Sequence, residues 1–363
     1  MNDFVLNFIP GLTIFHMIGF FLILILTNFL VIKIWHISNF SLIPYKGEQV
    51  IHEKEISPLG GFCIYVWFFF ILLFLEKYFF VSGLISYIEI CLIAIPMVVV
   101  FLIEDIYHDI DIRFRLAVLS LTVIYSIFFW VNDFPLIELP FLDFFFESKI
   151  FTIFFYCFCL VGLMNGSNFI DGMNGLAAFY FISAICSCLY LCYCTGLIDD
   201  ALPLIFLGIG IIGFLVFNYP LGKIFLGDLG AYFISFFIGL WTINFFAINT
   251  QISSWNAILI FFYPITEVLY SFIRKTYEGK SPFYPDTKHL HRKIFDIILH
   301  ITKRHLVSNA LTTILLLIFW LLPSLSIPLV YDNNYAIITT FTFFIIIYFV
   351  ANMYSESILK KIN

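Results

Sequence analysis

Charged side chains are scarce in this sequence. Asp, Glu, Lys and Arg make up 12% of its 363 residues, whereas a soluble globular domain has roughly a quarter. Low-complexity tracts and short-period repeats are absent as well, and no segment has the composition of a soluble domain. Of all 363 residues, 62% are hydrophobic, and the mean hydropathy of the sequence is +1.03. The sequence therefore predicts an all-α polytopic membrane protein that forms a single integral membrane domain over 1–363.

Metal-binding cysteine pairs and a cleavable signal peptide are also missing. The eight cysteines lie inside apolar runs, and several are two positions apart, which turns their side chains to different sides of a helix. We interpret them as small buried hydrophobic residues. The first apolar run is long enough to cross a bilayer, and no small-residue cleavage site follows it, so we expect it to be a membrane span.

Runs of about 20 mainly apolar residues, the length needed to cross a bilayer, recur along the chain. We expect ten to eleven membrane-spanning helices. The candidates are 13–35, 60–80, 84–103, 114–131, 149–168, 176–197, 201–217, 229–248, 254–275, 305–331 and 334–355. The longest polar segments, 36–58 and 276–304, lie between candidate spans.

Lys and Arg are sorted to one side of this arrangement. With eleven spans and the amino terminus outside, sixteen of the eighteen Lys and Arg residues fall on the inner side or at its boundary. The two exceptions are Lys77 and Lys149. Because cytoplasmic loops of membrane proteins are enriched in Lys and Arg, we expect the amino terminus outside and every chemically rich loop on the cytoplasmic face.

One polar segment interrupts the apolar pattern in the middle of the chain. Residues 165–176 read NGSNFIDGMNGL and separate two apolar runs. Asn165, Asn168 and Asp171 are three positions apart, so they would share one side of a continuing helix. Polar groups at membrane depth tend to line a functional cavity. The alternative is a polar cap between two spans.

Further carboxylates lie at two other expected span ends. Glu104 and Asp105 are adjacent, and like charges so close require a cation, either a divalent ion or a nearby Lys or Arg. Asp228 is flanked by glycines at the start of a span, where it is exposed enough to coordinate Mg²⁺. The alternative for Glu104 and Asp105 is a solvated helix end. The alternative for Asp228 is a glycine-rich turn in which it caps the helix.

Cations and an aromatic ring lie near these carboxylates in the sequence. Lys54 precedes the pair Gly60–Gly61, which allows a close approach of the backbone, and it could reach a phosphate. Lys223 and Phe225 precede Asp228 and could meet a phosphate and a base ring. A plain cytoplasmic loop is the alternative interpretation of the segment around Lys54.

Residues 281–293 concentrate imidazoles and cations. Two histidines (His289 and His291), Asp286 and three cations (Lys288, Arg292 and Lys293) would form an anion pocket. The two histidines with Asp286 would alternatively form a zinc site. Glu267 lies within an expected span, where a carboxylate should have a partner. Glu267 could either form a structural pair with a neighbouring helix or take a direct part in function.

Three of these segments together resemble one family. Residues 165–176 are similar to the pattern N-x-x-N-x-x-D-G-x-x-G-L, 223–230 to K-x-F-x-G-D-x-G, and 281–291 to S-P-F-x-P-D-x-x-H-x-H. The chain thus resembles, over roughly residues 45–300, the polyprenyl-phosphate N-acetylhexosamine-1-phosphate transferases of glycosyltransferase family 4, in particular the GlcNAc-1-phosphate transferase branch. The family's Asp-Asp pair is Glu104-Asp105 here, as in a subgroup of surface-polysaccharide enzymes, some of which use deoxy-N-acetylhexosamines.

The resemblance implies an activity and its participants. Undecaprenyl phosphate, from the bilayer of a bacterial inner membrane, would receive a sugar phosphate from a UDP-N-acetylhexosamine at the cytoplasmic face, with release of UMP. The sugar would be GlcNAc or a deoxy-N-acetylhexosamine, and the product would initiate a surface polysaccharide such as a lipopolysaccharide O-antigen. Mg²⁺ would be the cofactor, with Mn²⁺ as a substitute. We expect no nucleic-acid partner, and a homodimer is a candidate assembly.

The resemblance also implies residue roles. The residues implied in catalysis are Glu104, Asp105, Asp171, Asp228, His289 and His291. Those implied in substrate binding are Lys54, Asn165, Asn168, Lys223, Phe225 and Arg292. Asp228 and Asp171 would hold the metal ion. Two rival interpretations are a secondary transporter, which would usually show inverted repeats and charges at the bilayer midplane, and a non-catalytic relative that binds a lipid phosphate.

Overall fold

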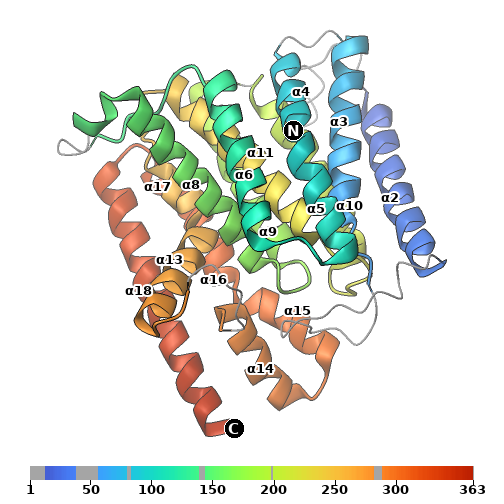
Figure 1. The fold of residues 1–363 in the computed structure, drawn as a ribbon, viewed down its shortest axis with the longest axis vertical. Coiled ribbons are helices and arrows are strands. Elements are labelled where there is room, and N and C mark those ends of the chain that lie inside the picture. Colours follow the sequence, from blue (N-terminus) through green and yellow to red (C-terminus); the bar gives the residue numbers. More distant parts are fainter. Residues whose placement is uncertain are drawn as a thin grey trace.

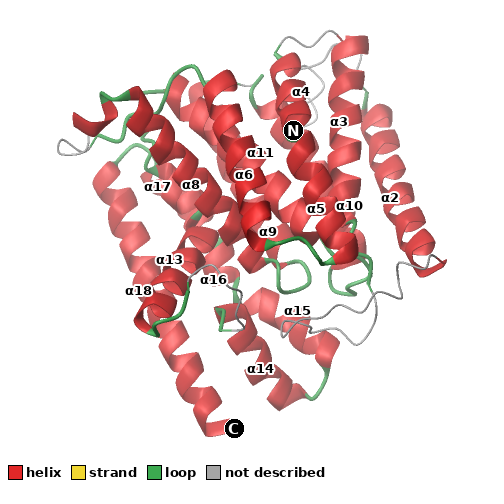
Figure 2. Cartoon of the chain, viewed as in Figure 1, coloured by secondary structure: helices red, strands yellow, loops and turns green. Residues whose placement is uncertain are grey.

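The structure, a computed structural model, describes residues 13–37, 56–79, 83–138, 144–197, 199–281 and 288–362. Within these ranges the regular structure is helical throughout (Figure 2). The one pairing of extended backbone among them is a single parallel bridge between Ser57 and Ile224. The all-α fold expected from the sequence is confirmed.

The helices of the described residues follow one another along the chain, and the arrangement is shown in Figure 1. They are α2 (Ile14–Ile37), α3 (Gly60–Phe79), α4 (Leu84–Ile93), α5 (Ile95–Tyr107), α6 (Ile112–Trp130), α8 (Lys149–Ile170), α9 (Leu176–Thr195), α10 (Ala201–Asn218), α11 (Gly227–Ile248), α12 (Asn256–Ile260), α13 (Phe262–Tyr277), α14 (Leu290–Thr302), α15 (His305–Leu315), α16 (Leu317–Trp320), α17 (Leu322–Val330) and α18 (Asn334–Ile362).

The multi-pass membrane architecture is confirmed, and ten of the eleven candidate spans have helices that match them. In the part of the chain that the structure describes, nine helical segments are long and apolar enough to cross a membrane, one of them α15 to α17 taken together. Helices α4 and α5 form a tenth span if this pair, bent by 49°, is counted as one. Pro96 in the first turn of α5 lacks an N–H group, which favours the break. The candidate at 254–275 is instead the short α12 followed by α13, whose 16 residues include Glu267, Arg274 and Lys275.

Helix α11 forms the centre of the bundle. Its most apolar 18-residue stretch is 83% buried, and it packs against α3, α5, α8 and α9. Large side chains such as Phe233, Phe237 and Trp241 are almost completely buried along it. The outer helices α2 and α18 are only 17% and 22% buried over the same length, as expected for helices that face hydrocarbon. A central, tightly packed α11 fixes the position of Asp228 in its first turn.

Two short helices lie beyond one end of the bundle. Figure 1 shows α14 and α15 below the long helices, beside the lower half of α18, and α14 packs against both α15 and α18. Helix α14 is amphipathic: Leu290, Phe295 and Ile298 are buried on one side. This packing brings the histidine-rich segment to the end of the bundle where α8 ends and α11 begins.

Candidate active site

Asp105 lies in the last turn of α5 and caps the neighbouring helix α11. Its buried carboxylate accepts the backbone N–H groups of Asp228 and Leu229, at 2.7 and 3.1 Å. The first N–H groups of a helix have no partner within that helix, and the positive end of the helix dipole favours a carboxylate. Both oxygens of Asp105 therefore serve to fix Asp228 in place. A direct part of Asp105 in the chemistry stays a prediction.

Arg115, from the start of α6, joins Glu104 to Asp228. Its Nη1 atom donates to Glu104 Oε1 at 2.9 Å and to Asp228 Oδ2 at 3.0 Å. The adjacent acids Glu104 and Asp105 required a nearby cation, and for Glu104 this cation is Arg115. Motif spacing alone does not single out Arg115, because it lies in another helix, eleven positions after Glu104.

Helix α8 contributes an amide and a carboxylate to the same place. Asn168 donates its Nδ2 group to Asp228 Oδ1 at 2.8 Å. The helix ends at Ile170, and Asp171 follows as its capping residue. Burial, together with the negative charge of Asp228, raises the pKa of Asp171 well above its ordinary value. Glu104, Asp171 and Asp228, hereafter the carboxylate cluster, are thus held at one end of the bundle.

Asn165 has a different environment from Asn168. It lies one turn earlier on α8, and its side-chain amide donates to the carbonyl oxygen of Val161 in the same helix at 2.8 Å. The common side expected for Asn165, Asn168 and Asp171 thus brings Asn168 into contact with the carboxylate cluster, while the recorded bond of Asn165 stays within α8. Substrate binding by Asn165 stays a prediction.

The segment that leads to Asp228 is anchored by backbone contacts with α3. Phe225 donates its N–H to the carbonyl of Ser57 at 2.8 Å and accepts the N–H of Gly60 at 2.9 Å. A Cβ atom on Gly61 would lie 2.2 Å from Cα of Gly230. The glycine pair therefore permits close contact between α3 and α11. The ring of Phe225 is half-buried, and its contact with a base stays a prediction.

The three cations predicted to bind phosphate have different surroundings. The side chain of Lys223 is exposed beside the turn that precedes α11. Arg292 pairs through Nε with Asp296 Oδ1, one turn further along α14, at 3.1 Å. Lys54 lies outside the described residues. The structure does not test phosphate binding by these three residues.

His289 and His291 form a second group of polar side chains, hereafter the imidazole cluster. Their rings are parallel, with centroids 5.6 Å apart. Burial, followed in size by the neighbouring His289, lowers the pKa of His291 to about 3, so this ring is neutral near neutral pH. Its Nδ1 atom is buried and has no hydrogen-bond partner in the described part of the chain. His289, in contrast, lies with Nδ1 2.9 Å from Glu267 Oε1.

The loop after α8 joins the two clusters. A Cβ atom on Gly172 would lie 2.3 Å from Nε2 of His291, so the loop and the ring are in direct contact only because residue 172 is glycine. The ring of Phe169 lies 5.1 Å from that of His289. Since Asp171 lies between these two positions, carboxylates and imidazoles belong to one site.

The donor set of this site fits Mg²⁺ better than zinc. No group of three or more His, Cys, Asp or Glu side chains that could hold a metal ion occurs in the described ranges. The zinc alternative also needs Asp286, which lies outside them. Mg²⁺ needs only one or two carboxylates, because water and phosphate oxygens complete its shell. Asp171 and Asp228 fit this requirement, since a cation would offset both the burial and the repulsion by Asp228 that raise the pKa of Asp171.

Comparison with known proteins agrees with this geometry. The sequence profile of glycosyl transferase family 4 matches residues 87–246, which contain the whole carboxylate cluster. The undecaprenyl-phosphate alpha-N-acetylglucosaminyl 1-phosphate transferase of Thermotoga maritima is 29% identical over 242 residues, 66% of this chain and 68% of that protein. The chain is therefore similar to glycosyl transferase family 4 over residues 87–246. The histidines and α18 lie beyond the segment that the family profile matches.

Two other known proteins are similar to the chain over shorter segments. The decaprenyl-phosphate N-acetylglucosaminephosphotransferase of Mycobacterium tuberculosis is 29% identical over 160 residues, 38% of this chain and 39% of that protein. The phospho-N-acetylmuramoyl-pentapeptide-transferase of Streptococcus pneumoniae is 36% identical over 81 residues, 22% of this chain and 25% of that protein. This chain therefore spans well under half the length of these two relatives.

Proposed function

We propose that this protein is a polyprenyl-phosphate sugar-1-phosphate transferase. The observation that carries the proposal is the meeting of Glu104 of α5 and Asp228 of α11 on Arg115, with Asn168 of α8 bonded to Asp228, at an end of a membrane bundle. A lipid phosphate anchored in the bilayer can reach such a helix end from the side, and a soluble nucleotide sugar can reach it from the water. The names of the relatives from Thermotoga and Mycobacterium support the same activity.

The reaction is a phosphoryl transfer from a UDP-N-acetylhexosamine. A phosphate oxygen of the polyprenyl phosphate attacks the β-phosphorus, which bears the sugar, so that a new P–O bond forms. The bond between the α- and β-phosphates breaks, and UMP leaves with the electron pair. Such a reaction depends on position and on neutralised charge more than on covalent chemistry. Arg115 keeps Glu104 and Asp228 oriented, and His289 would supply a polar group beside Phe169, at the end of α8.

Asp171 and Asp228 would hold Mg²⁺ in this enzyme, with Mn²⁺ as a substitute. When bound, the ion would neutralise the diphosphate and polarise the bond that breaks. Glu104 points to Arg115 and would lie toward the lipid phosphate, where it holds the phosphate or accepts its proton. Asp105 keeps the first turn of α11 in place for this arrangement.

The proposed acceptor is undecaprenyl phosphate, and the proposed place is the cytoplasmic face of a bacterial inner membrane. Lys275, Lys280, Lys288 and Arg292 lie at the same end of the bundle as the site, which agrees with a cytoplasmic face. GlcNAc and a deoxy-N-acetylhexosamine are the proposed sugars. The Glu104-Asp105 pair supports initiation of a surface polysaccharide, such as an O-antigen, as the pathway.

A direct test uses the purified protein in bilayer nanodiscs. It is incubated with undecaprenyl phosphate, Mg²⁺ and, one at a time, labelled UDP-GlcNAc, UDP-GalNAc and UDP-deoxy-N-acetylhexosamines, and the lipid product is identified by mass spectrometry. We expect one UMP released for each undecaprenyl-diphosphate sugar formed. Binding of the lipid phosphate without any product would instead support a non-catalytic relative, and movement of an intact nucleotide sugar across the bilayer would support a transporter.

A further inference from the structure

The carboxylate of Glu267 lies at a junction of three elements. Glu267 is on α13, and its side chain is completely buried. Its Oε1 atom lies 2.9 Å from Nδ1 of His289, which immediately precedes α14, and its Oε2 atom accepts the hydroxyl of Tyr348 on α18 at 2.5 Å. Tyr348 is completely buried as well. Two side chains distant in sequence are thus bonded to one buried carboxylate.

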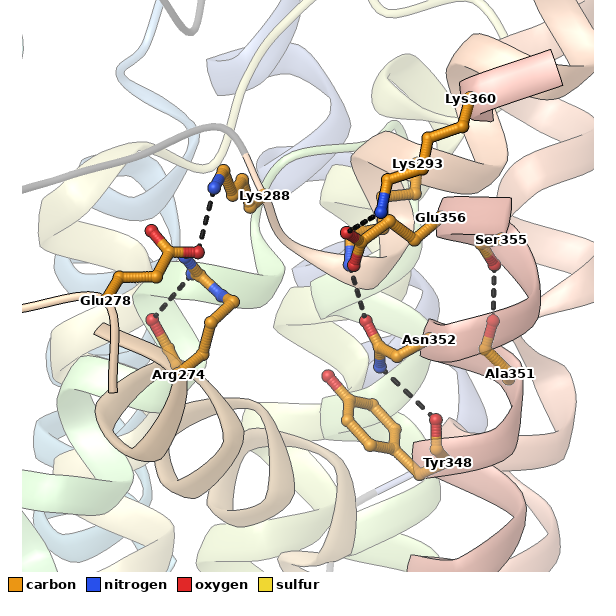
Figure 3. A network of polar contacts seen from close by, with 11 residues as sticks. Arg274, Glu278, Lys288, Lys293, Tyr348, Ala351, Asn352, Ser355, Glu356 and Lys360 are labelled. Carbon is orange, nitrogen blue, oxygen red and sulfur yellow. Dashed lines mark hydrogen bonds and ion pairs between the residues drawn. The ribbon is translucent and has the colours of Figure 1, made fainter. Parts of the chain in front are cut away.

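The same stretch of α18 also holds α14. Figure 3 shows Lys293 of α14 directed at Asn352 and Glu356, with Nζ 3.3 Å from Asn352 Oδ1 and 3.7 Å from Glu356 Oε2. The amide of Asn352 in turn donates to the backbone carbonyl of Tyr348 at 3.3 Å. Helix α18 is therefore linked to the histidine-bearing segment in two ways. Its Tyr348 bonds Glu267, which meets His289, and its Asn352 and Glu356 lie next to Lys293. Neither contact could be anticipated from the sequence, since α18 reads as an ordinary apolar span.

We propose that Tyr348 and Glu267 are positioning residues that hold His289 with a proton on Nδ1 and so fix the orientation of its ring in the proposed transferase site. The inference rests on the proposed function and extends it to α13 and α18. An ionised carboxylate can only accept hydrogen bonds, so Nδ1 must donate whether the ring is neutral or charged. The hydroxyl of Tyr348 restricts the carboxylate to one orientation, and the buried surroundings strengthen both bonds. With Nδ1 donating to Glu267, the orientation of the ring is fixed and the proton on Nδ1 is retained.

This proposal differs from a purely structural pairing in what it requires of His289. A structural pair would only fix the distance between α13 and α14. A positioning role also fixes which ring nitrogen carries the proton and requires that the variants act on turnover through His289. Removal of a group that orients an imidazole ligand or catalyst typically costs ~10–100-fold in activity.

The first test detects the proton on Nδ1 of His289 directly. The protein is labelled with ¹⁵N-histidine, and the ring signals of His289 are assigned by their loss in His289→Gln. We expect Nδ1 to be protonated in the wild type and to lose that proton, in whole or in part, in Glu267→Gln and Tyr348→Phe. A wild-type ring with an unprotonated Nδ1, or a pattern unchanged in both variants, would overturn the proposal. This measurement needs no turnover, so it remains decisive if His289→Gln is inactive.

The second test is kinetic and uses a double-mutant cycle. Tyr348→Phe removes one hydroxyl, and we expect kcat to fall ~10-fold while KM for the nucleotide sugar stays the same. In a His289→Gln background the same substitution should have no further effect on kcat, because the ring that it positions is gone. An equal loss in both backgrounds would assign Tyr348 a structural role unrelated to His289.

Tyr156→Phe is the matched control. Tyr156 is also buried, and its hydroxyl donates to the carbonyl of Pro135 at 2.7 Å, away from the site. We expect it to change neither kcat nor the ring signals, and a loss equal to that of Tyr348→Phe would contradict the proposal. If the wild type forms no lipid-linked sugar at all, the proposed function fails, whatever the ring signals show. If the wild type is active and the ring signals of His289 are the same in Glu267→Gln and Tyr348→Phe as in the wild type, only the positioning role fails.

Discussion

The Nη1 atom of Arg115 lies 3.0 Å from Oδ2 of Asp228, and this ion pair joins α6 to the first turn of α11. The same nitrogen lies 2.9 Å from Oε1 of Glu104 on α5. One cation therefore serves two carboxylates from two other helices. Since the Arg115 side chain is only 23% exposed, the charges are partly removed from water, and the bridge is stronger than a surface ion pair. It keeps Glu104 and Asp228 close together despite their like charge.

Replacement of Arg115 by Ala should therefore disable the site. Loss of hydrogen bonds to two carboxylates should raise the barrier by about 1.5–3 kcal/mol, or lower the rate of UMP release ~10–100-fold. Arg115→Lys should recover only part of the rate, because an ammonium lacks the planar fork. Arg113→Ala is the control, since Arg113 is exposed two positions earlier on the same helix. Equal rates for Arg115→Ala and Arg113→Ala would refute the bridge as a functional element.

The two adjacent acids of α5 should respond differently to amide substitution. Glu104→Gln should lower turnover more than affinity for the nucleotide sugar, since Glu104 is directed at Arg115 and the site. Asp105→Asn should also lower the unfolding temperature, because an amide group would face one of the two N–H donors of α11. Turnover, nucleotide-sugar binding and thermal unfolding in detergent separate the two effects. Full turnover in Glu104→Gln would exclude Glu104 from the chemistry.

Gly172 should tolerate no side chain. In Gly172→Ala the new Cβ would lie 2.3 Å from Nε2 of His291, so the loop or the ring must move. We expect overpacking to cost about 1–3 kcal/mol of stability and to lower turnover, because the loop carries Asp171. Gly162→Ala on α8 is the control, since nothing lies within 4 Å of its added Cβ. Activity and unfolding temperature are measured for both, and a Gly172→Ala enzyme as active as Gly162→Ala would contradict the close contact.

The buried His291 ring should make stability depend on pH. Its folded pKa is about 3, below the ordinary value of 6.5, so at intermediate pH the unfolded chain binds a proton that the folded chain does not. Stability is therefore fully present above the ordinary value and is lost as pH falls toward the folded pKa, with a slope of at most about 1.4 kcal/mol per pH unit. His291→Gln should lose less stability than the wild type between about pH 7 and about pH 5. If the unfolding temperatures of the wild type and of His291→Gln changed with pH in the same way, a contribution of His291 to the pH dependence of stability would be ruled out.

The helical fold and the chemical segments could be predicted because both leave local signals. Apolar runs of spanning length predicted eleven candidate spans, ten of which have matching helices, and carboxylates at run ends predicted a site at one end of the bundle. The candidate span at 254–275 has the required apolar residues, but Glu267, Arg274 and Lys275 fall in its second half. There the chain forms α13, which packs against α8 and carries the carboxylate that meets His289.

The partners of these residues could not be predicted, because they depend on how distant helices pack. Nothing near Glu104 in the sequence distinguishes Arg115 from Arg113, and only the position of α6 selects it. Gly61 allows close approach as expected, but its neighbour is the backbone of Gly230. The hydroxyl of Tyr348 meets Glu267 81 positions away in the chain, which no local pattern records.

The dependence of UMP release on Mg²⁺, measured for the wild type and for Asp228→Asn, tests the central claim most directly. The amide keeps the shape of the side chain and an acceptor for Asn168, but it removes the charge that would hold the ion. We expect saturable activation by Mg²⁺ in the wild type and a rate at least ~10²–10³-fold lower in Asp228→Asn at every Mg²⁺ concentration. Equal rates and equal Mg²⁺ profiles in the two proteins would contradict a metal-assisted transfer at the carboxylate cluster.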